Sequence, residues 1–514
     1  MDWQGLMLVC RQWRDVLVST PAFWRKVHVR LDGRDGWTER CLALSASTSL
    51  DVGVVPILRR EFSLSILYPH VHRFRSFRFS SLYCLRLLAT LPHLFGNGMP
   101  LLEDLHFVAH RLITTTEDID LQLTSQRFPR LRALSLSGTV SPQGISLYAQ
   151  LRTLSLSDCS HNLSFDRFLD ALAASTQLEE LSLMAALHLF TDDWVWDEAV
   201  PRRTPIFLPR LRELRLEEHG ILRTSHFLAH LRLHPSVALW IEGTFKETDY
   251  VTHSPDTIHT ITALLPPDHN TTLPALSAAT TVSMEVWGDE YEISCGTPRT
   301  ETKKKDIPNA MLKLTPNGGR GWDRSMAQGL DDLINSFGRS PLTRLNVDGD
   351  HRYGTVDAWT RVFQTFPLLE ILDVSGEPDV SVETVFVGLH AASVIAPQTD
   401  EGLTIACPKL KTVNVEGAQG TVEMYEAMLD CFRYRAEKEV VLETLNLGFA
   451  VHADDAPSDV RRAYIKDLRE VVGYVSRWVR SGSDFIFASE TEHSDSESES
   501  EGPDSELDES ESVG

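Results

Sequence analysis

Long apolar runs are missing from this chain of 514 residues. No window reaches the roughly eighteen apolar residues that a membrane-spanning helix needs. The N-terminus also lacks the basic start, the apolar run and the small-residue cleavage site of a secretion signal. The sequence therefore predicts an intracellular protein, cytoplasmic, nuclear or both, with no membrane partner.

Cysteine is scarce, and basic residues are outnumbered. The seven cysteines are widely scattered and never spaced CxxC, which argues against a disulfide framework or a zinc site. We expect them to be small buried apolar residues. Lysine and arginine total 49 against 72 aspartates and glutamates, which gives a net charge of −23. Because nucleic-acid binding rests on clustered cations, no nucleic-acid partner is expected.

Signatures of catalysis are missing too. The chain has no HExxH zinc motif, no Walker glycine loop and no GxSxG elbow. The glycine-rich stretch 317–321 follows no clear strand-to-helix transition and is typical of a turn. The adjacent acids Asp331 and Asp332 point in different directions on a helix or a strand, so they do not converge on one substrate atom. The sequence predicts a non-catalytic protein with no cofactor and no metal.

A short apolar phrase recurs along most of the chain. It consists of an apolar residue, two variable positions, a second apolar residue, one variable position and a third apolar residue, and its copies are about 20 to 45 residues apart. This pattern is typical of leucine-rich repeats, here in a degenerate form. Clear copies begin at Leu131, Leu151, Leu178, Leu211, Leu342, Leu369, Leu410 and Leu442, and weaker ones lie at Phe74, Leu102, 237–241, 282–286 and 311–314.

Amphipathic helices are predicted between the strands, at 165–172, 330–337, 359–366 and 425–432. A last helix, at about 458–480, is expected to cap the open end of the stack. The predicted fold class is therefore α/β, a leucine-rich-repeat horseshoe over residues 30–482, with parallel strands on its concave face. Three stretches, 186–207, 243–278 and 288–309, break the regularity and are expected to be irregular insertions.

The variable positions of each phrase are expected to line the concave face, because side chains alternate across a strand. Taken singly, these residues are ordinary solvated strand positions. Taken together, a polar concave sheet is the surface that solenoids use to bind other proteins. The candidate target-binding residues are Ser135, Ser155, Ser182, Arg215, Asn346 and Asn414.

The most specific signature lies at Leu6–Val29, which reads LMLVCRQWRDVLVSTPAFWRKVHV. Apolar residues from Leu6 to Leu17 recur at helical spacing and predict a stripe along one side of a helix. Pro21 ends that helix, because proline disfavours the α region in the residue before it. Trp24 follows, and Val27 and Val29 alternate as in a short strand.

The runs V-C-R-x-W-R-D-V, S-T-P-x-x-W and V-x-V in this segment resemble the second half of a fungal, basidiomycete-type F-box. The family's first helix has no counterpart here, so residues 1–29 are interpreted as an N-terminally truncated F-box. The resemblance implies docking on the Skp adaptor of a cullin–RING ubiquitin ligase, although Trp13 and Trp24 serve equally well as core of the box itself. The implied adaptor-binding residues are Leu6, Val9, Cys10, Trp13, Val16, Pro21 and Trp24.

Residues 483–514 are predicted to form a disordered acidic tail. From Glu490 onward this segment alternates serine with acids, eleven in all, and has too little apolar surface to offset chain entropy. It acts either as a solubilising segment or as a substrate for an acidophilic kinase. The candidate phosphorylation sites are Ser494, Ser496 and Ser498.

Two functions follow from these patterns. The resemblance implies the substrate-recognition subunit of an SCF-type ubiquitin ligase, in which the F-box binds the Skp adaptor and through it a cullin, while the repeats hold a protein target. The alternative is a non-enzymatic repeat scaffold with a vestigial F-box. A weaker third interpretation is an acidic-tailed nuclear protein that engages basic partners.

Overall fold

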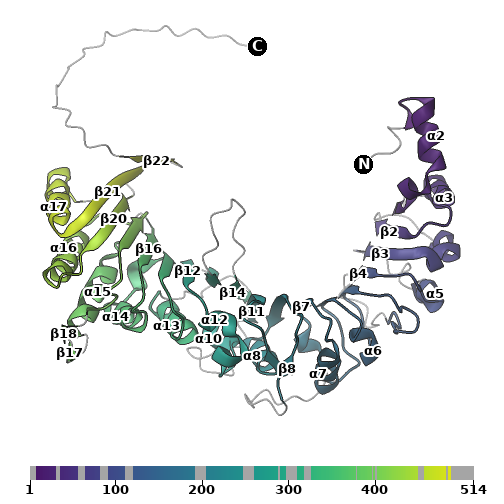
Figure 1. The fold of residues 1–514 in the computed structure, drawn as a ribbon, viewed down its shortest axis with the longest axis horizontal. Coiled ribbons are helices and arrows are strands. Elements are labelled where there is room, and N and C mark those ends of the chain that lie inside the picture. The colour runs from purple at the N-terminus through teal and green to yellow at the C-terminus, as the bar shows by residue number, and fades with distance from the viewer. Residues whose placement is uncertain are drawn as a thin grey trace, which may run out of the picture.

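The protein is a single curved solenoid in the computed structural model, with strands on the concave side and helices on the convex side (Figure 1). The structure describes a large part of the chain, and every statement below concerns that part. The described residues are 7–30, 35–55, 64–81, 91–109, 120–190, 204–246, 260–287, 290–296, 309–317, 326–377, 379–395, 398–399, 402–403, 405–449, 456–481 and 484–487.

One sheet of 18 described strands runs the length of the arc. Its strands are β1 (Lys26–Arg30), β2 (Leu50–Val55), β3 (Phe74–Ser81), β4 (Asp104–Ala109), β5 (Ala133–Ser137), β6 (Thr153–Ser157), β7 (Glu180–Met184), β9 (Glu213–His219), β11 (Ala238–Lys246), β12 (Thr281–Trp287), β13 (Glu290–Gly296), β14 (Ala310–Asn317), β15 (Arg344–Gly349), β16 (Ile371–Gly376), β19 (Thr412–Glu416), β20 (Leu442–Phe449), β21 (Val472–Ser481) and β22 (Asp484–Phe487). Two short pairs lie outside it, β8 (Ile206–Phe207) with β10 (Leu231–Arg232) and β17 (Gln398–Thr399) with β18 (Gly402–Leu403).

Helices and 3-10 turns connect the strands. The α-helices are α2 (Arg11–Ser19), α3 (Asp35–Leu44), α5 (Leu91–Gly96), α6 (Ile145–Tyr148), α7 (Phe165–Ala174), α8 (Ile221–Ala229), α10 (Ile261–Leu264), α11 (His269–Thr272), α12 (Pro274–Ser277), α13 (Met326–Phe337), α14 (Val356–Thr365), α15 (Glu383–Ile395), α16 (Val422–Glu437) and α17 (Ser458–Val471). The 3-10 turns are η1 (Pro21–Trp24), η2 (Leu64–Arg73), η3 (Leu187–Leu189) and η5 (His351–Tyr353).

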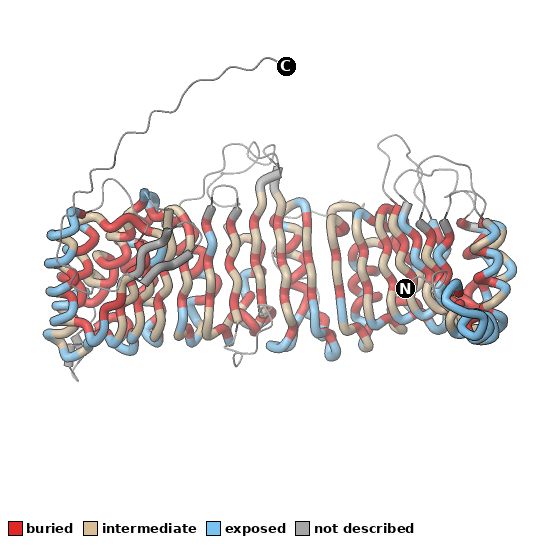
Figure 2. Tube along the Cα trace, turned by 90° about the horizontal axis from the view of Figure 1, so that it is seen from above, coloured by how far each residue is buried: buried red, intermediate tan, exposed pale blue. Residues whose placement is uncertain are grey.

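The recurring apolar phrase builds the core, as the sequence predicts. Leu134 and Leu154 are paired in register on neighbouring parallel strands, and Leu181 and Leu214 continue the same row. Each of these four side chains is buried, and buried and half-buried positions alternate along the strands (Figure 2). The stacked leucines confirm the α/β leucine-rich-repeat solenoid.

The four helices predicted between strands are confirmed as α7, α13, α14 and α16. Three of them begin at a hydroxyl side chain that accepts a hydrogen bond from a backbone N–H three residues on. Ser164 caps α7, Thr355 caps α14 and Thr421 caps α16. The apolar stripe of each helix packs on the sheet and closes the convex side of the core.

The middle of the sheet departs from the expected simple parallel order. Strand β11 pairs with β14 rather than with β12, and β13 lies between β14 and β12, antiparallel to both. The stretch 288–309 therefore contains a strand and is not wholly an irregular insertion. Every second side chain of β13 is buried in the core of the solenoid, which explains why this strand joins the sheet. These side chains are Tyr291, Ile293 and Cys295.

A buried carboxylate holds this rearranged region together. Asp332 of α13, 2% exposed, accepts hydrogen bonds from the backbone N–H of Ile261 at 3.0 Å and from the hydroxyl of Thr262 at 2.9 Å, at the start of α10. It also accepts one from the Tyr291 hydroxyl at 2.9 Å. One side chain thus joins α13, α10 and the antiparallel strand β13, because a buried carboxylate needs such partners.

The helix predicted at 458–480 is wrong in its second half. Helix α17 ends at Val471, and Val472–Ser481 forms strand β21, parallel to β20. Val472 and Val475 pair in register with Leu442 and Leu445, so they take the first two apolar positions of the repeat phrase, and Arg477 stands at the third, opposite Leu447. The same apolar residues fit a helical period, and the β-branched run favours the strand.

The disordered tail predicted for residues 483–514 is wrong for its first residues. Asp484–Phe487 forms strand β22, which pairs antiparallel with β21. The candidate phosphorylation sites Ser494, Ser496 and Ser498 lie outside the described residues, as does the rest of that segment.

We predict that Asp332→Ala lowers the free energy of unfolding by about 3 kcal/mol, because several buried donors lose a charged acceptor. Tyr291→Phe removes one of these bonds and is expected to cost about 1 kcal/mol. Urea unfolding followed by circular dichroism measures both changes.

The matched control is Asp331→Ala, one residue away. Asp331 is exposed and pairs only at the surface with Arg361, so its loss is expected to cost less than about 1 kcal/mol. Equal losses for the two aspartates would contradict the role given to Asp332.

Candidate protein-binding surfaces

Helix α2 stands at the N-terminal end of the solenoid (Figure 1). It begins after Cys10, whose sulfur accepts a hydrogen bond from the backbone N–H of Trp13 at 3.5 Å. It ends at Ser19, and Pro21 takes the first position of η1, where its missing N–H costs nothing. Cys10 therefore caps the start of α2, and Pro21 begins η1. The sequence predicts both as adaptor-binding residues.

One side of this segment is fastened to the solenoid. Leu17 and Trp24 are both 1% exposed, and the indole N–H of Trp24 donates to the carbonyl of Leu17 at 2.7 Å. The rings of Trp24 and Trp37 of α3 meet edge to face, with centroids 5.8 Å apart. The assignment of Trp24 to adaptor binding is therefore corrected, because its side chain is buried and joins α2 to α3 through Leu17 and Trp37.

Apolar side chains on α2 and just before it are exposed. Trp13 is 52% exposed and Val16 49%, and their spacing of three residues places them on one helix face. Leu8 and Val9 precede the helix and are also exposed, as is Val18 near its end. We call these five side chains the α2 apolar face. Leu6, the remaining predicted adaptor contact, lies outside the described residues.

The second surface is the concave face of the sheet. The six predicted target-binding residues lie in one row that crosses the strands of the sheet. Neighbouring members of this row are paired in register on adjacent strands, and residues of other strands complete it. The full row, from N-terminal to C-terminal strands, is Ser135, Ser155, Ser182, Arg215, Trp240, Met311, Ser294, Ser283, Asn346, Asp373 and Asn414.

At the C-terminal end of this row the polar side chains bind one another. Ser476 donates to Asn446, Asn446 donates to Asn414 at 2.7 Å, and Asn414 donates to the carboxylate of Asp373. The other oxygen of that carboxylate accepts from Arg344 at 2.7 Å. The amide of Asn414 is thus engaged within the sheet and has a structural role there, while its contact with a target stays a prediction.

Two of the other five candidates also have partners within the sheet. Asn346 donates to the hydroxyl of Ser283 at 3.0 Å. The guanidinium of Arg215 lies over the ring of Trp240, 4.7 Å from its centroid, in a cation–π contact. The sequence reasoning missed Trp240 as a surface residue, although the weak phrase at 237–241 already contains it.

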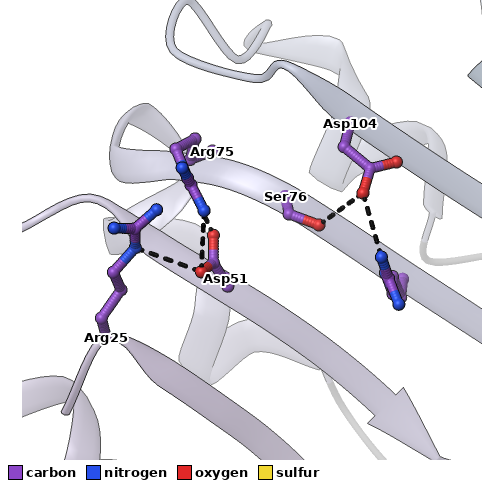
Figure 3. A network of polar contacts seen from close by, with 6 residues as sticks. Arg25, Asp51, Arg75, Ser76 and Asp104 are labelled. Carbon is purple, nitrogen blue, oxygen red and sulfur yellow. Dashed lines mark hydrogen bonds and ion pairs between the residues drawn. The ribbon is translucent and has the colours of Figure 1, made fainter. Parts of the chain in front are cut away.

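Charges at the N-terminal end of the concave face are paired (Figure 3). Asp51 accepts two bonds from Arg75, at 3.0 and 3.1 Å, and also pairs with Arg25 at 3.1 Å. On the next strands, Asp104 pairs with Arg78 at 3.3 Å and accepts a hydrogen bond from Ser76 at 3.1 Å. Carboxylates and guanidinium groups from adjacent strands therefore neutralise one another there.

Charges in the middle of the concave face are arranged differently. Glu217 and Glu242 face each other on neighbouring strands, and so do Glu292 and Glu285. Partial burial, and next the charge of Glu242, raise the pKa of the Glu217 carboxyl above its usual range. The sequence reasoning missed this feature, because it depends on the strand order β11, β14, β13, β12.

Three further observations concern the described residues. No three or more histidine, cysteine or acidic side chains among them are grouped so as to hold a metal ion. Five of the six described cysteines are buried, and burial raises the pKa of the thiols of Cys295 and Cys431 to about 12. No described helix has the length and apolar character needed to cross a membrane.

Comparison with known proteins adds little. No family model matches the chain, and no curated protein matches it. Among solved structures, an internalin (inlF) from Listeria monocytogenes str. 4b F2365 is similar over 94% of this chain and 95% of that chain, with 13% identity and a TM-score of 0.30. That score is too low to support an argument, so the repeat fold rests on the strand register described above.

We predict that Asn414→Ala lowers stability by about 1 to 2 kcal/mol, because Asp373 loses a donor and Asn446 loses an acceptor. Thr412→Ala, on the same face of the same strand, is the control and is expected to change stability by less than about 0.5 kcal/mol. Thermal unfolding measures the difference. Unchanged stability of Asn414→Ala would contradict a structural role for the asparagine ladder.

Proposed function

We propose that this protein is a non-catalytic scaffold that holds a protein target on its concave face and docks through α2 on the Skp-type adaptor of a cullin–RING ubiquitin ligase. The observation that carries the proposal is the α2 apolar face. Exposed apolar patches on a protein in water mark interaction sites, and tryptophan is over-represented among the residues that dominate binding energy.

The way in which α2 is anchored supports docking by a rigid surface. Leu17 and Trp24 fix the helix to the solenoid, so the exposed Trp13 and Val16 are held in place without help from a partner. A preorganised surface loses little conformational entropy on binding. The resemblance of this segment to an F-box names the adaptor as the partner that fits.

The mechanism in this proposal is proximity. The adaptor joins the scaffold to the ligase, and the concave face keeps the target near the ligase's catalytic subunits, so the effective concentration of target rises. No side chain of this protein takes part in the transfer of ubiquitin. The second candidate, a scaffold that works outside any ligase, differs only in the partner that covers the α2 apolar face.

Direct binding to a purified Skp-type adaptor tests the proposal. We expect the wild-type chain to bind, and the double variant Trp13→Ala with Val16→Ala to bind at least about 30-fold more weakly, since residues that dominate an interface contribute about 2 kcal/mol or more. Both positions are exposed, so the fold is expected to survive the change.

Tyr353→Ala is the matched control, because Tyr353 is 56% exposed but lies far along the chain in η5. It is expected to bind the adaptor like the wild type. No binding by the wild-type chain would contradict docking on this adaptor, and equal binding by the double variant would contradict docking through α2.

A further inference from the structure

Three polar atoms surround the backbone of Gly354, which lies between η5 and helix α14. A side chain at this position would place its first carbon 3.2 Å from the carbonyl oxygen of His351. The same point lies 3.3 Å from Nε1 of Trp359 on α14 and 3.4 Å from Oγ1 of Thr384 on α15. Atoms from three elements therefore converge beside one glycine, and we call this place the Gly354 site.

Two of these three atoms are buried without a hydrogen-bond partner. Nε1 of Trp359 and Oγ1 of Thr384 make no hydrogen bond within the described part of the chain. The indole ring is held in place, because it stacks on the rings of His351 and Phe363, with centroids 6.2 and 5.6 Å away. A buried indole N–H usually has a partner, and leaving such a donor unpaired costs free energy.

The packing of α15 on α14 brings the two unpaired groups to the same place. A Cβ on Gly388 of α15 would lie 2.5 Å from the Cβ of Trp359, so the helices are in close contact there. Thr384 lies four residues before Gly388 and therefore on the same face of α15. The contact between the helices thus directs the hydroxyl of Thr384 and the indole N–H of Trp359 toward the Gly354 site.

Glycine provides room at this position and not an unusual conformation. Gly354 is buried and has φ −75° and ψ 126°, values that residues with side chains adopt readily. Its own N–H donates to the carbonyl of His351 at 2.9 Å. Because a carbonyl oxygen has two lone pairs, that of His351 is able to accept a second hydrogen bond.

We propose that the Gly354 site binds a single water molecule, which accepts a hydrogen bond from Trp359, donates one to the carbonyl of His351 and pairs with the hydroxyl of Thr384. The chemistry of the three groups selects this ligand. An indole N–H only donates and a carbonyl only accepts, so a metal cation does not suit the first and a chloride ion does not suit the second. A water molecule suits both, and buried waters typically make about three hydrogen bonds.

This water joins η5, α14 and α15 through hydrogen bonds that the three elements do not make directly. The inference goes beyond the proposed function and does not depend on it, since neither the α2 apolar face nor the concave face takes part.

A crystal structure of the full chain, at a resolution that shows ordered water, tests the inference directly. We expect the density of one water oxygen within hydrogen-bond distance of Nε1 of Trp359 and of the carbonyl oxygen of His351. No such density, or a direct hydrogen bond between Thr384 and Trp359, would overturn the inference.

The variant Thr384→Val tests it in solution, because the direction of its effect depends on the water. Valine has nearly the shape of threonine and lacks the hydroxyl. If the hydroxyl binds water, its removal is expected to lower the midpoint of thermal unfolding by about 2 °C. A hydroxyl that is buried without any partner is instead a cost to the folded state, so an unchanged or higher midpoint would overturn the inference.

Thr224→Val is the matched control. The hydroxyl of Thr224 on α8 is also buried without a hydrogen-bond partner in the described part of the chain, but it is not among the atoms that surround a described glycine. This variant is expected to unfold at the same temperature as the wild type or at a higher one. Equal decreases in the two valine variants would overturn the inference.

Gly354→Ala completes the experiment, because its methyl group takes the place of the water. In the Gly354→Ala background the hydroxyl of Thr384 has lost its partner, so the further change Thr384→Val is expected to leave the unfolding midpoint unchanged or to raise it. This coupling distinguishes a bound water from a simple packing effect. The same decrease on Thr384→Val with glycine and with alanine at position 354 would overturn the inference.

Discussion

The structure depends on the in-register stacking of apolar side chains from one strand to the next. A single repeat exposes its leucines on both sides, and only its neighbours bury them. Leu134, Leu154 and Leu181 illustrate the rule, since each is covered by the strand before and the strand after. The constraint leaves two open ends, and the chain treats them differently: α2, η1 and Trp24 lie at the first, and β22 pairs with β21 at the last.

The same stacking determines which side chains are neighbours on the concave face. Residues far apart in sequence become neighbours because their strands share a register, so charge is organised across the sheet rather than along the chain. Asp51 meets two arginines, Asp373 ends a ladder of amides and hydroxyls, and Glu242 stands beside Glu217. Three chemical environments therefore follow one another along one surface. Ion pairs dominate the first and side-chain amides the last, and the middle one places carboxylates opposite one another on neighbouring strands.

Much of this organisation could be predicted from the sequence, because the repeat phrase specifies both the strands and the face of each residue. The row containing Ser135, Arg215 and Asn346 follows from that phrase alone. The segment after Leu468 could not be assigned in this way, since its valines satisfy the periods of a helix and a strand equally well. Only the pairing of Val475 with Leu445 decides between them.

The candidate surfaces show the same division. Helical spacing places Val9, Trp13 and Leu17 on one segment, but which side faces the protein depends on the contact of Leu17 with Trp24. The partners of Asn414 and of Glu242 depend on which strands are adjacent. In the middle of the sheet that order does not follow the sequence, because β13 runs antiparallel between β14 and β12. Strand order is a tertiary property that local patterns do not contain.

The reversed position of β12 and β14 has a consequence for how the chain folds. Folding of a repeat protein spreads from unit to neighbouring unit, because each unit contacts only its neighbours. Here β12 is synthesised before β14, yet β14 is the strand that pairs with β11. The stack from β1 to β11 has no acceptor for β12 until β13 and β14 have been made. The three strands are therefore expected to join the sheet together, as one folding unit.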